Sequence, residues 1–206
     1  GLILEIGEWV LREACLMLGR WQQHGMDKGL SVSVNVSALQ LQRGDFPQVV
    51  RQVLEDTGLA PGSLELELTE SVLMANAEQT AARLQAFRDM GVPLAIDDFG
   101  TGYSSLAYLK RLPLTAIKVD KAFVDDVSTD PDDAAITSTI ITMAHSLGLK
   151  VVAEGVETEA QVRFLRSRGC DEIQGFWVAP PMDGHACLAF IRSWEPRRAL
   201  ATGAAP

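Results

Sequence analysis

Segments with strand character and segments with helix character alternate six times along this chain of 206 residues, and that order restricts the possible folds most strongly. Each strand-like segment is short and bounded by polar residues, glycine or proline, and a helix-like segment follows it. The expected strands are residues 31–37, 64–70, 94–98, 115–120, 150–157 and 171–176. Because strand and helix alternate, we predict an α/β protein with a parallel sheet covered by helices.

The expected helices have periodic apolar residues, and glycine or proline marks several of their ends. They cover residues 2–24, 46–57, 76–90, 104–110, 131–147, 158–168 and 183–194, whereas the stretch around Phe123 has no clear assignment. Residues 195–206 are rich in Ala, Arg and Pro and are predicted to be a disordered tail. Residues 1–194 are therefore expected to form one domain.

The two faces of each expected strand differ, since successive side chains point to opposite sides. One face is aliphatic and suits packing on helices, while the other has small residues and then a polar group near the C-terminal end of the strand. These polar residues are Asn35, Glu67, Asp97, Lys118, Glu154 and Gln174. In a closed barrel of strands and helices such residues converge at the C-terminal mouth, where active sites lie. Each of them alone is equally compatible with a helix cap or a solvated strand end.

A (β/α)8 barrel requires eight strands, and six are recognisable here. We therefore expect a modified and incomplete TIM barrel of about six strand–helix units, with its first two strands upstream of Gly1. An open doubly wound sheet is the alternative, but no strand precedes a GxGxxG or GxxxxGK[ST] loop. Glu65 also has the inward parity, and Lys150 is a candidate partner for it.

Asp97 and Asp98 are adjacent carboxylates at the end of a strand, before a loop that contains Gly100 and Gly102. Two carboxylates repel each other unless a cation lies between them, and Mg²⁺, Mn²⁺ or Ca²⁺ suits hard oxygen ligands. In the alternative interpretation, Asp97 only ends the strand and Asp98 caps the following turn.

The net charge of −9 argues against a polymeric nucleic acid or an anionic membrane as a partner. A small phosphorylated ligand stays compatible if metal ions supply positive charge. Cys15, Cys170 and Cys187 show neither a disulfide framework nor metal-ligand spacing, which fits a reducing, cytoplasmic compartment. No apolar run reaches the roughly 20 residues that span a bilayer. Because the chain begins inside a helix, targeting and a membrane anchor upstream are left open.

Several sequence motifs, taken together and in order, resemble the EAL-domain family of bacterial cyclic di-GMP phosphodiesterases. They are NVSALQL at 35–41, ELTES at 67–71, DDFGTGYSSLAYL at 97–109, KVDKAFV at 118–124, AEGVET at 153–158 and QGF at 174–176. The resemblance implies a modified TIM barrel with one antiparallel strand, and hydrolysis of cyclic di-GMP to linear pGpG. It also implies two divalent cations, Mg²⁺ or Mn²⁺, with Ca²⁺ substituting or inhibiting.

The same resemblance implies roles for individual residues. Asn35, Glu67 and Asp97 would bind the first metal, and Asp97, Asp98 and Glu154 the second. Lys118 would hold the attacking water or the developing phosphate charge, with Glu157 and Gln174 completing the site. Glu70 would anchor the glycine loop from Asp98 to Ser105, which in the family couples dimer contacts to the metals. The implied partners are cyclic di-GMP, a second copy of the chain, and a fused GGDEF or sensory domain.

The chain departs from the family pattern in two places. It starts after the Glu–Ala–Leu motif and the nearby Arg, so it is expected to be truncated at its N-terminus and to have weak or no activity by itself. Pro180 stands where the family usually has Lys or Arg. A non-enzymatic cyclic di-GMP receptor is the alternative function. A lyase that forms a Schiff base on Lys118 is a further alternative, disfavoured by the acidic residues of the site.

Overall fold

The computed structural model describes residues 1–27, 29–74, 77–100, 102 and 106–194. The expected tail at 195–206 and most of the glycine loop after Gly100 lie outside the described residues. Six strands form one sheet in these residues. The strands are β1 (Val32–Asn35), β2 (Leu64–Thr69), β3 (Leu94–Phe99), β4 (Ala116–Val119), β5 (Lys150–Ala153) and β6 (Glu172–Ile173).

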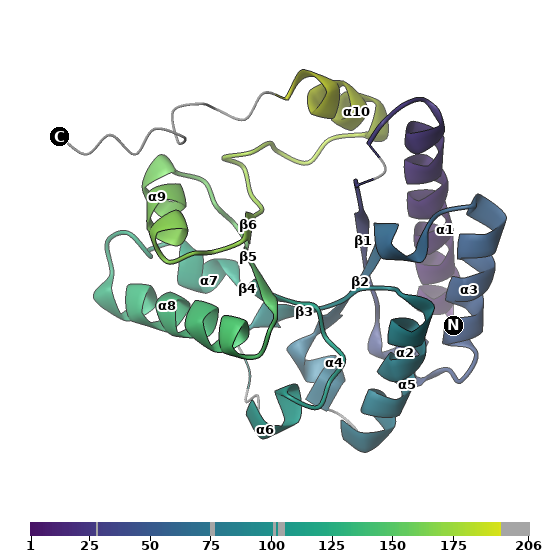
Figure 1. Ribbon diagram of the computed structural model, residues 1–206, viewed down its shortest axis with the longest axis horizontal. Helices are drawn as coiled ribbons and strands as arrows, with labels where there is room; N and C mark the ends of the chain where they lie inside the picture. Colours follow the sequence, from purple (N-terminus) through teal and green to yellow (C-terminus); the bar gives the residue numbers. More distant parts are fainter. Residues whose placement is uncertain (28, 75–76, 101, 103–105, 195–206) are drawn as a thin grey trace.

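The strands follow one another in chain order, β1-β2-β3-β4-β5-β6, and all five pairings are parallel. The sheet curves into a half-barrel with helices around its outer side (Figure 1). No pairing joins β6 to β1 within the described part of the chain. The prediction of an incomplete α/β barrel of about six units is therefore confirmed. The antiparallel strand expected from the family is not among these six.

The helices form an outer layer, which is seen in Figure 1. On one side of the arc lie α1 (Leu2–Gln23), α2 (Ala38–Gln42), α3 (Phe46–Thr57) and α5 (Ala77–Met90). On the other side lie α7 (Lys121–Val124), α8 (Pro131–Ser146) and α9 (Glu159–Ser167). The shorter elements are η1 (Pro61–Ser63), α4 (Glu70–Met74) and α6 (Leu106–Leu109), and α10 (Gly184–Ser193) ends the described chain. Within that part, no helix is both long and apolar enough to cross a membrane.

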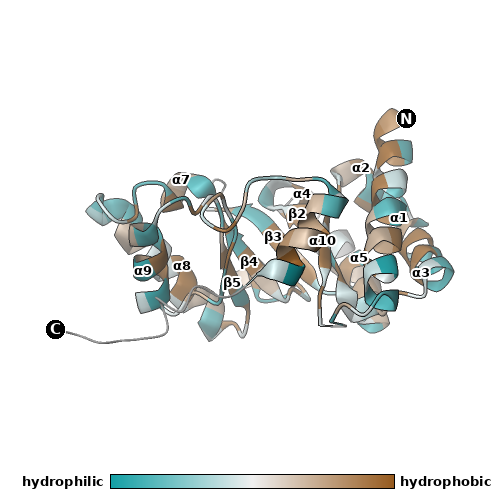
Figure 2. Cartoon of the chain, turned by 90° about the horizontal axis from the view of Figure 1, so that it is seen from above, coloured by the Kyte–Doolittle hydropathy of each residue, from teal (hydrophilic) through white to brown (hydrophobic). Residues whose placement is uncertain are grey.

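The core lies between the sheet and this outer layer. Leu64, Leu66 and Leu68 alternate along β2 and are each no more than 1% exposed. Phe46 of α3 meets Phe87 of α5 edge to face, with ring centroids 5.7 Å apart, which ties two neighbouring helices together. Figure 2 shows hydrophobic and hydrophilic residues alternating along the outer helices, as expected for helices with one buried and one exposed face. Because the aliphatic face of each strand packs against the helices, the opposite, polar face lies on the inner side of the sheet.

Several expected boundaries were wrong. The fifth strand ends at Ala153 rather than 157, since Gly155 has φ +66 and turns the chain. The sixth strand has only two residues. Gly175, shortly after this strand, lies so close to the backbone of Val156 that an added Cβ atom would be 2.3 Å from that backbone. Short helices α2, α4 and α7 were not predicted, because four or five residues give too few periods for a pattern.

Candidate active site

Lys118 stands at the centre of the polar inner face and is 4% exposed. Its ammonium lies 2.9 Å from Glu67 Oε2, 3.2 Å from Asp97 Oδ1 and 2.6 Å from Glu154 Oε1. Burial alone would lower the pKa of Lys118, but hydrogen bonds to Glu154 and Glu67 outweigh it and the pKa is raised. These contacts favour the charged form of the side chain, which argues against the Schiff-base lyase.

The parallel sheet explains why these groups meet. Glu67 comes from β2, Asp97 from β3 and Lys118 from β4, and Glu154 directly follows β5. Each side chain has the inward parity on its strand, and parallel strands end at the same edge of the sheet. Four segments that are distant in sequence thus deliver three carboxylates to one ammonium.

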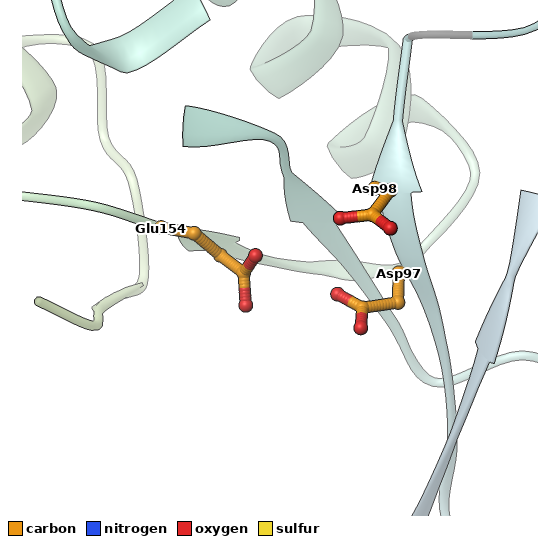
Figure 3. A group of neighbouring side chains, drawn as sticks. All are labelled: Asp97, Asp98 and Glu154. Carbon is orange, nitrogen blue, oxygen red and sulfur yellow. The ribbon is translucent and has the colours of Figure 1, made fainter. Parts of the chain in front are cut away.

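Asp97, Asp98 and Glu154 form a second, overlapping group, in which one ligand atom from each lies within 4.8 Å of the others. Figure 3 shows the two aspartates on one strand end with Glu154 facing them from across the mouth. Asp98 has φ +53, a left-handed conformation that is unusual for a residue other than glycine. Burial and the nearby Asp97 and Asp120 raise the pKa of Asp98. The site therefore favours the arrival of a cation.

Asp97 Oδ1 offers the most direct sign of such a cation. This oxygen is buried and makes no hydrogen bond, although the Lys118 ammonium lies within ion-pair distance. A buried carboxylate oxygen without a hydrogen bond is costly unless a further positive group binds it. All ligand candidates are hard oxygens, and such a set fits Mg²⁺, Mn²⁺ or Ca²⁺ rather than softer metals.

A cavity of about 310 Å³ opens on the inner face beside this cluster. Its lining includes residues of predicted inward parity from four strands, β1, β2, β4 and β5, together with Gln174 after β6: Ser33, Glu65, Glu67, Lys118, Val152 and Gln174. Ile173, which was predicted to face away from Gln174, lines the cavity as well. The remaining wall comes from β6 and the segment after it, namely Glu172, Ile173, Gly175, Val178 and Ala179. The predicted site residue Gln174 thus shares a cavity with Glu67 and Lys118.

The other predicted site residues lie at different distances from the cluster. Asn35 is the register partner of Glu67 at the end of β1, so it stands next to the first proposed ligand set. Glu70 is 4% exposed and accepts hydrogen bonds from the N–H groups of Gly100 and Gly102, both 3.2 Å long. Glu157 is exposed and pairs with Lys121 instead of joining the carboxylates around Lys118.

The structure also settles the question of Glu65 and Lys150. Lys150 pairs with Glu172 at 3.2 Å, whereas Glu65 accepts a hydrogen bond from Ser33 Oγ at 3.0 Å. Burial raises the pKa of Glu65, and the hydrogen bond from Ser33 opposes this only in part. The candidate pairing of Glu65 with Lys150 is thus not formed.

Three residues around the site were not singled out from the sequence. Asp120 follows Lys118 by two positions and has its parity, a signal that could have placed it near Asp98. Lys121 and Gln161 gave no such signal, because they lie on helices α7 and α9 and reach the site segments only through the fold.

An α/β half-barrel with acidic residues and a lysine at the C-terminal ends of its strands defines a class, the α/β barrels whose functional sites lie at that face. Within this class the chain belongs to the EAL domain family, whose sequence profile matches residues 1–181.

Curated relatives include two proteins of Pseudomonas aeruginosa. The bifunctional diguanylate cyclase/cyclic di-GMP phosphodiesterase MucR is 47% identical over 191 residues, which are 93% of this chain and 28% of MucR. The cyclic di-GMP phosphodiesterase NbdA is 47% identical over 195 residues, 95% of this chain and 25% of NbdA. The chain thus spans about a quarter of the length of these relatives.

Solved structures agree with this assignment. The MucR phosphodiesterase in complex with c-di-GMP matches with a TM-score of 0.87 and 46% identity, covering 91% of this chain and 75% of that one. The EAL domain of Mycobacterium smegmatis DcpA matches with a TM-score of 0.90 and 39% identity, covering 95% of this chain and 88% of that one. Klebsiella pneumoniae BlrP1 with manganese and c-di-GMP matches with a TM-score of 0.76 and 30% identity, covering 84% of this chain and 44% of that one. A complex of BlrP1 with calcium and c-di-GMP also matches.

Proposed function

We propose that this chain is the catalytic domain of a phosphodiesterase that hydrolyses one phosphodiester bond of cyclic di-GMP and releases linear pGpG. The observation that carries the proposal is the convergence of Glu67, Asp97 and Glu154 on Lys118, with Asp98 beside them. The relatives named as cyclic di-GMP phosphodiesterases support the choice of substrate.

Divalent cations would be held by the oxygens of Asn35, Glu67, Asp97, Asp98 and Glu154. When bound, such ions lower the pKa of water and neutralise phosphate charge. We propose Mg²⁺ or Mn²⁺ as the working ion, with Ca²⁺ as a replacement that binds and inhibits. The complexes of BlrP1 with manganese and with calcium support divalent ions of this size and hardness.

The residues of the chain contribute charge and geometry. The carboxylates beside Lys118 raise its pKa, and the charged ammonium can stabilise negative charge that develops on the phosphate. The carboxylates would repel a phosphodiester without cations, which makes activity depend on the metal. Glu70 would hold the start of the glycine loop over the mouth, and Gln174 would contact the substrate from the cavity.

The test uses residues 1–206 and the longer natural protein that contains them. Release of pGpG is measured by anion-exchange chromatography and should require Mg²⁺ or Mn²⁺. Asp97→Asn should reduce the rate of this release more than about 100-fold. Asp89→Asn changes an exposed aspartate in α5 and should leave the rate unchanged. Absence of hydrolysis by the longer protein with either metal would reject the enzyme.

Binding of cyclic di-GMP without hydrolysis in the same experiment would instead support the receptor alternative. We also propose that the chain acts as a homodimer and is fused in its natural protein to a GGDEF or sensory domain, as the bifunctional name of MucR suggests. A cytoplasmic site of action is proposed because all three cysteines are free.

A further inference from the structure

The buried amide of Gln161 joins two segments that carry site residues. Gln161 lies in the first turn of α9 and is 4% exposed. Its Oε1 accepts hydrogen bonds from the N–H groups of Glu157 and Thr158, each 2.8 Å long. Its Nε2 donates to the carbonyls of Val124, at 3.2 Å, and Asp125, at 2.9 Å. One side chain thus satisfies backbone groups at the end of α7 and in the segment after β5.

We propose that Gln161 is a positioning residue that holds the segment bearing Glu154 against α7 and so fixes this carboxylate for metal binding. The inference rests on the proposed function, since it concerns the same metal site. Gln161 touches neither substrate nor metal ligands in this arrangement, and it acts through the backbone from Glu154 to Thr158.

The backbone of this segment is also held by the sheet edge, since Glu154 N–H donates to the Val119 carbonyl at 3.1 Å and Val156 N–H to the Gln174 carbonyl at 3.0 Å. Between the segment and α7, the other side-chain contacts are weaker constraints. Lys121 pairs with Glu157 and, at 3.3 Å, with Asp125, but these side chains are 45 to 49% exposed. Exposed ion pairs hold their partners loosely because water and salt compete for the charges. The hydrogen bonds of a buried amide are costly to break, since a buried amide left without partners keeps its full desolvation cost. Among the side-chain contacts between α7 and residues 154–158, the tie through Gln161 is therefore the firm one.

Helix α7 is itself fixed, so the tie has a rigid anchor. Thr137 of α8 is fully buried and donates to the carbonyl of Phe123 at 3.0 Å. The ring of Phe123 packs on Gly100, where an added Cβ atom would lie 2.7 Å from it. Gly100 follows Asp98 by two residues. Helix α7 thus contacts both segments that supply the carboxylates of Figure 3.

The substitution Gln161→Glu separates this tie from the helix cap. Thr158 and Gln161 form a capping box, and glutamate serves equally well in that motif. Glutamate keeps the acceptor for Glu157 and Thr158 but has no donor for the carbonyls of α7. The added negative charge by itself would attract a cation, so weaker metal binding would come from lost geometry.

The experiment measures Mn²⁺ binding to the full chain by electron paramagnetic resonance. We expect Gln161→Glu to weaken binding about tenfold, as supporting residues of metal sites do. Gln48→Glu is the matched control, because Gln48 is exposed at the same position in the first turn of α3. If Gln161→Glu does not fold, Gln161→Met removes the tie without adding charge and should weaken binding similarly.

Hydrogen exchange of residues 154–158 in metal-free protein gives the second measurement, and it should be faster in the Gln161 variants than in wild type or Gln48→Glu. Unchanged manganese affinity, with or without faster exchange, would overturn the inference. Failure of the wild type to bind Mn²⁺ would instead reject the proposed function, and unchanged exchange would then reject the tie as well.

Discussion

The ammonium of Lys118 and the carboxylates around it stabilise each other's charges. Lys118 compensates three carboxylates inside the protein, and it keeps its charge because these carboxylates surround it. Taking charged groups out of water is costly, so such a cluster persists only if each group has partners. The cluster is nevertheless acidic, with three carboxylates to one ammonium, and this excess leaves it suited to further cations.

Replacing Lys118 by alanine should separate these effects. Without the ammonium the carboxylates repel each other, and we expect the metal-free variant to lose about 3 kcal/mol of unfolding free energy. Manganese should restore part of this loss, so the rise in melting temperature on adding Mn²⁺ should be larger than in wild type. Differential scanning fluorimetry with EDTA or Mn²⁺ measures both quantities.

Lys150→Ala is the control for this change, since Lys150 and Glu172 form a pair that is 68% and 56% exposed. Its effect should stay below about 1 kcal/mol, with an unaltered response to Mn²⁺. A smaller manganese response in Lys118→Ala than in wild type would show that the carboxylates do not form the metal site.

Asp171 offers a pH test away from the proposed metal site. Partial burial would raise its pKa, but hydrogen bonds from His145 and the Val151 N–H, both 2.8 Å, outweigh this and lower the pKa. In acid the unfolded chain therefore binds more protons at Asp171 than the folded chain does. The contribution of Asp171 to stability is present above its unfolded pKa of about 3.9, and it disappears as the pH falls through the folded pKa.

Asp171→Asn should therefore lower the melting temperature at pH 7, and the difference from wild type should shrink below about pH 4. Thermal unfolding followed by circular dichroism between pH 3 and pH 7 (about one-unit steps) would measure it. Asp126→Asn, at an exposed aspartate, should show little difference throughout. A difference for Asp171→Asn that is constant with pH would contradict the ionic explanation.

At the scale of elements, hydrophobic periodicity was a good guide to long segments and a poor one to short segments. Helices α1, α3 and α8 begin and end within a residue or so of their expected bounds. The strand predicted from Lys150 extends to residue 157, yet Gly155 turns the chain through its positive φ and the strand ends at Ala153. Helices α2 and α7 depend on caps by Ser37 and Asp120, whose residue types are equally common in turns.

The end of α3 allows a clean test of backbone conformation. Gly58 has φ +65, and no atom lies within 4 Å of an added Cβ, so Gly58→Ala should cost only the left-handed conformation, about 1 kcal/mol of unfolding free energy. Gly62 of η1 has the same open space without a positive φ, and Gly62→Ala should be neutral or slightly stabilising. Urea unfolding measures both, and equal effects would contradict this account.

At the scale of the molecule, the half-barrel has β1 and β6 as its edges among the described residues, and α1 carries an exposed apolar stripe. The stripe consists of Leu2, Ile3, Ile6, Trp9 and Val10, from 39% to 72% exposed. These residues recur at helical spacing on one face, and a contiguous apolar face of this kind promotes association.

We expect residues 1–206 to self-associate as protein concentration rises. The net charge of −9 opposes this, so higher salt should increase association by screening the repulsion. Light scattering coupled to size exclusion would detect it, and Trp9→Glu should reduce it. Association that weakens with salt, or that is unaffected by Trp9→Glu, would point to ionic contacts rather than the stripe.

The amino-acid sequence by itself determined which residues face inward, because alternation of apolar and polar side chains along a strand has a period of two and needs no knowledge of neighbours. It therefore predicted Glu67, Asp97, Lys118 and Glu154 as one inner group. Only the tertiary structure decided that the three carboxylates contact the Lys118 ammonium. It also decided that Glu157 pairs with Lys121 instead, and that Gln161 joins α7 to the segment of Glu154. These contacts join residues distant in sequence, and their partners are set by strand register and helix packing rather than by any local pattern.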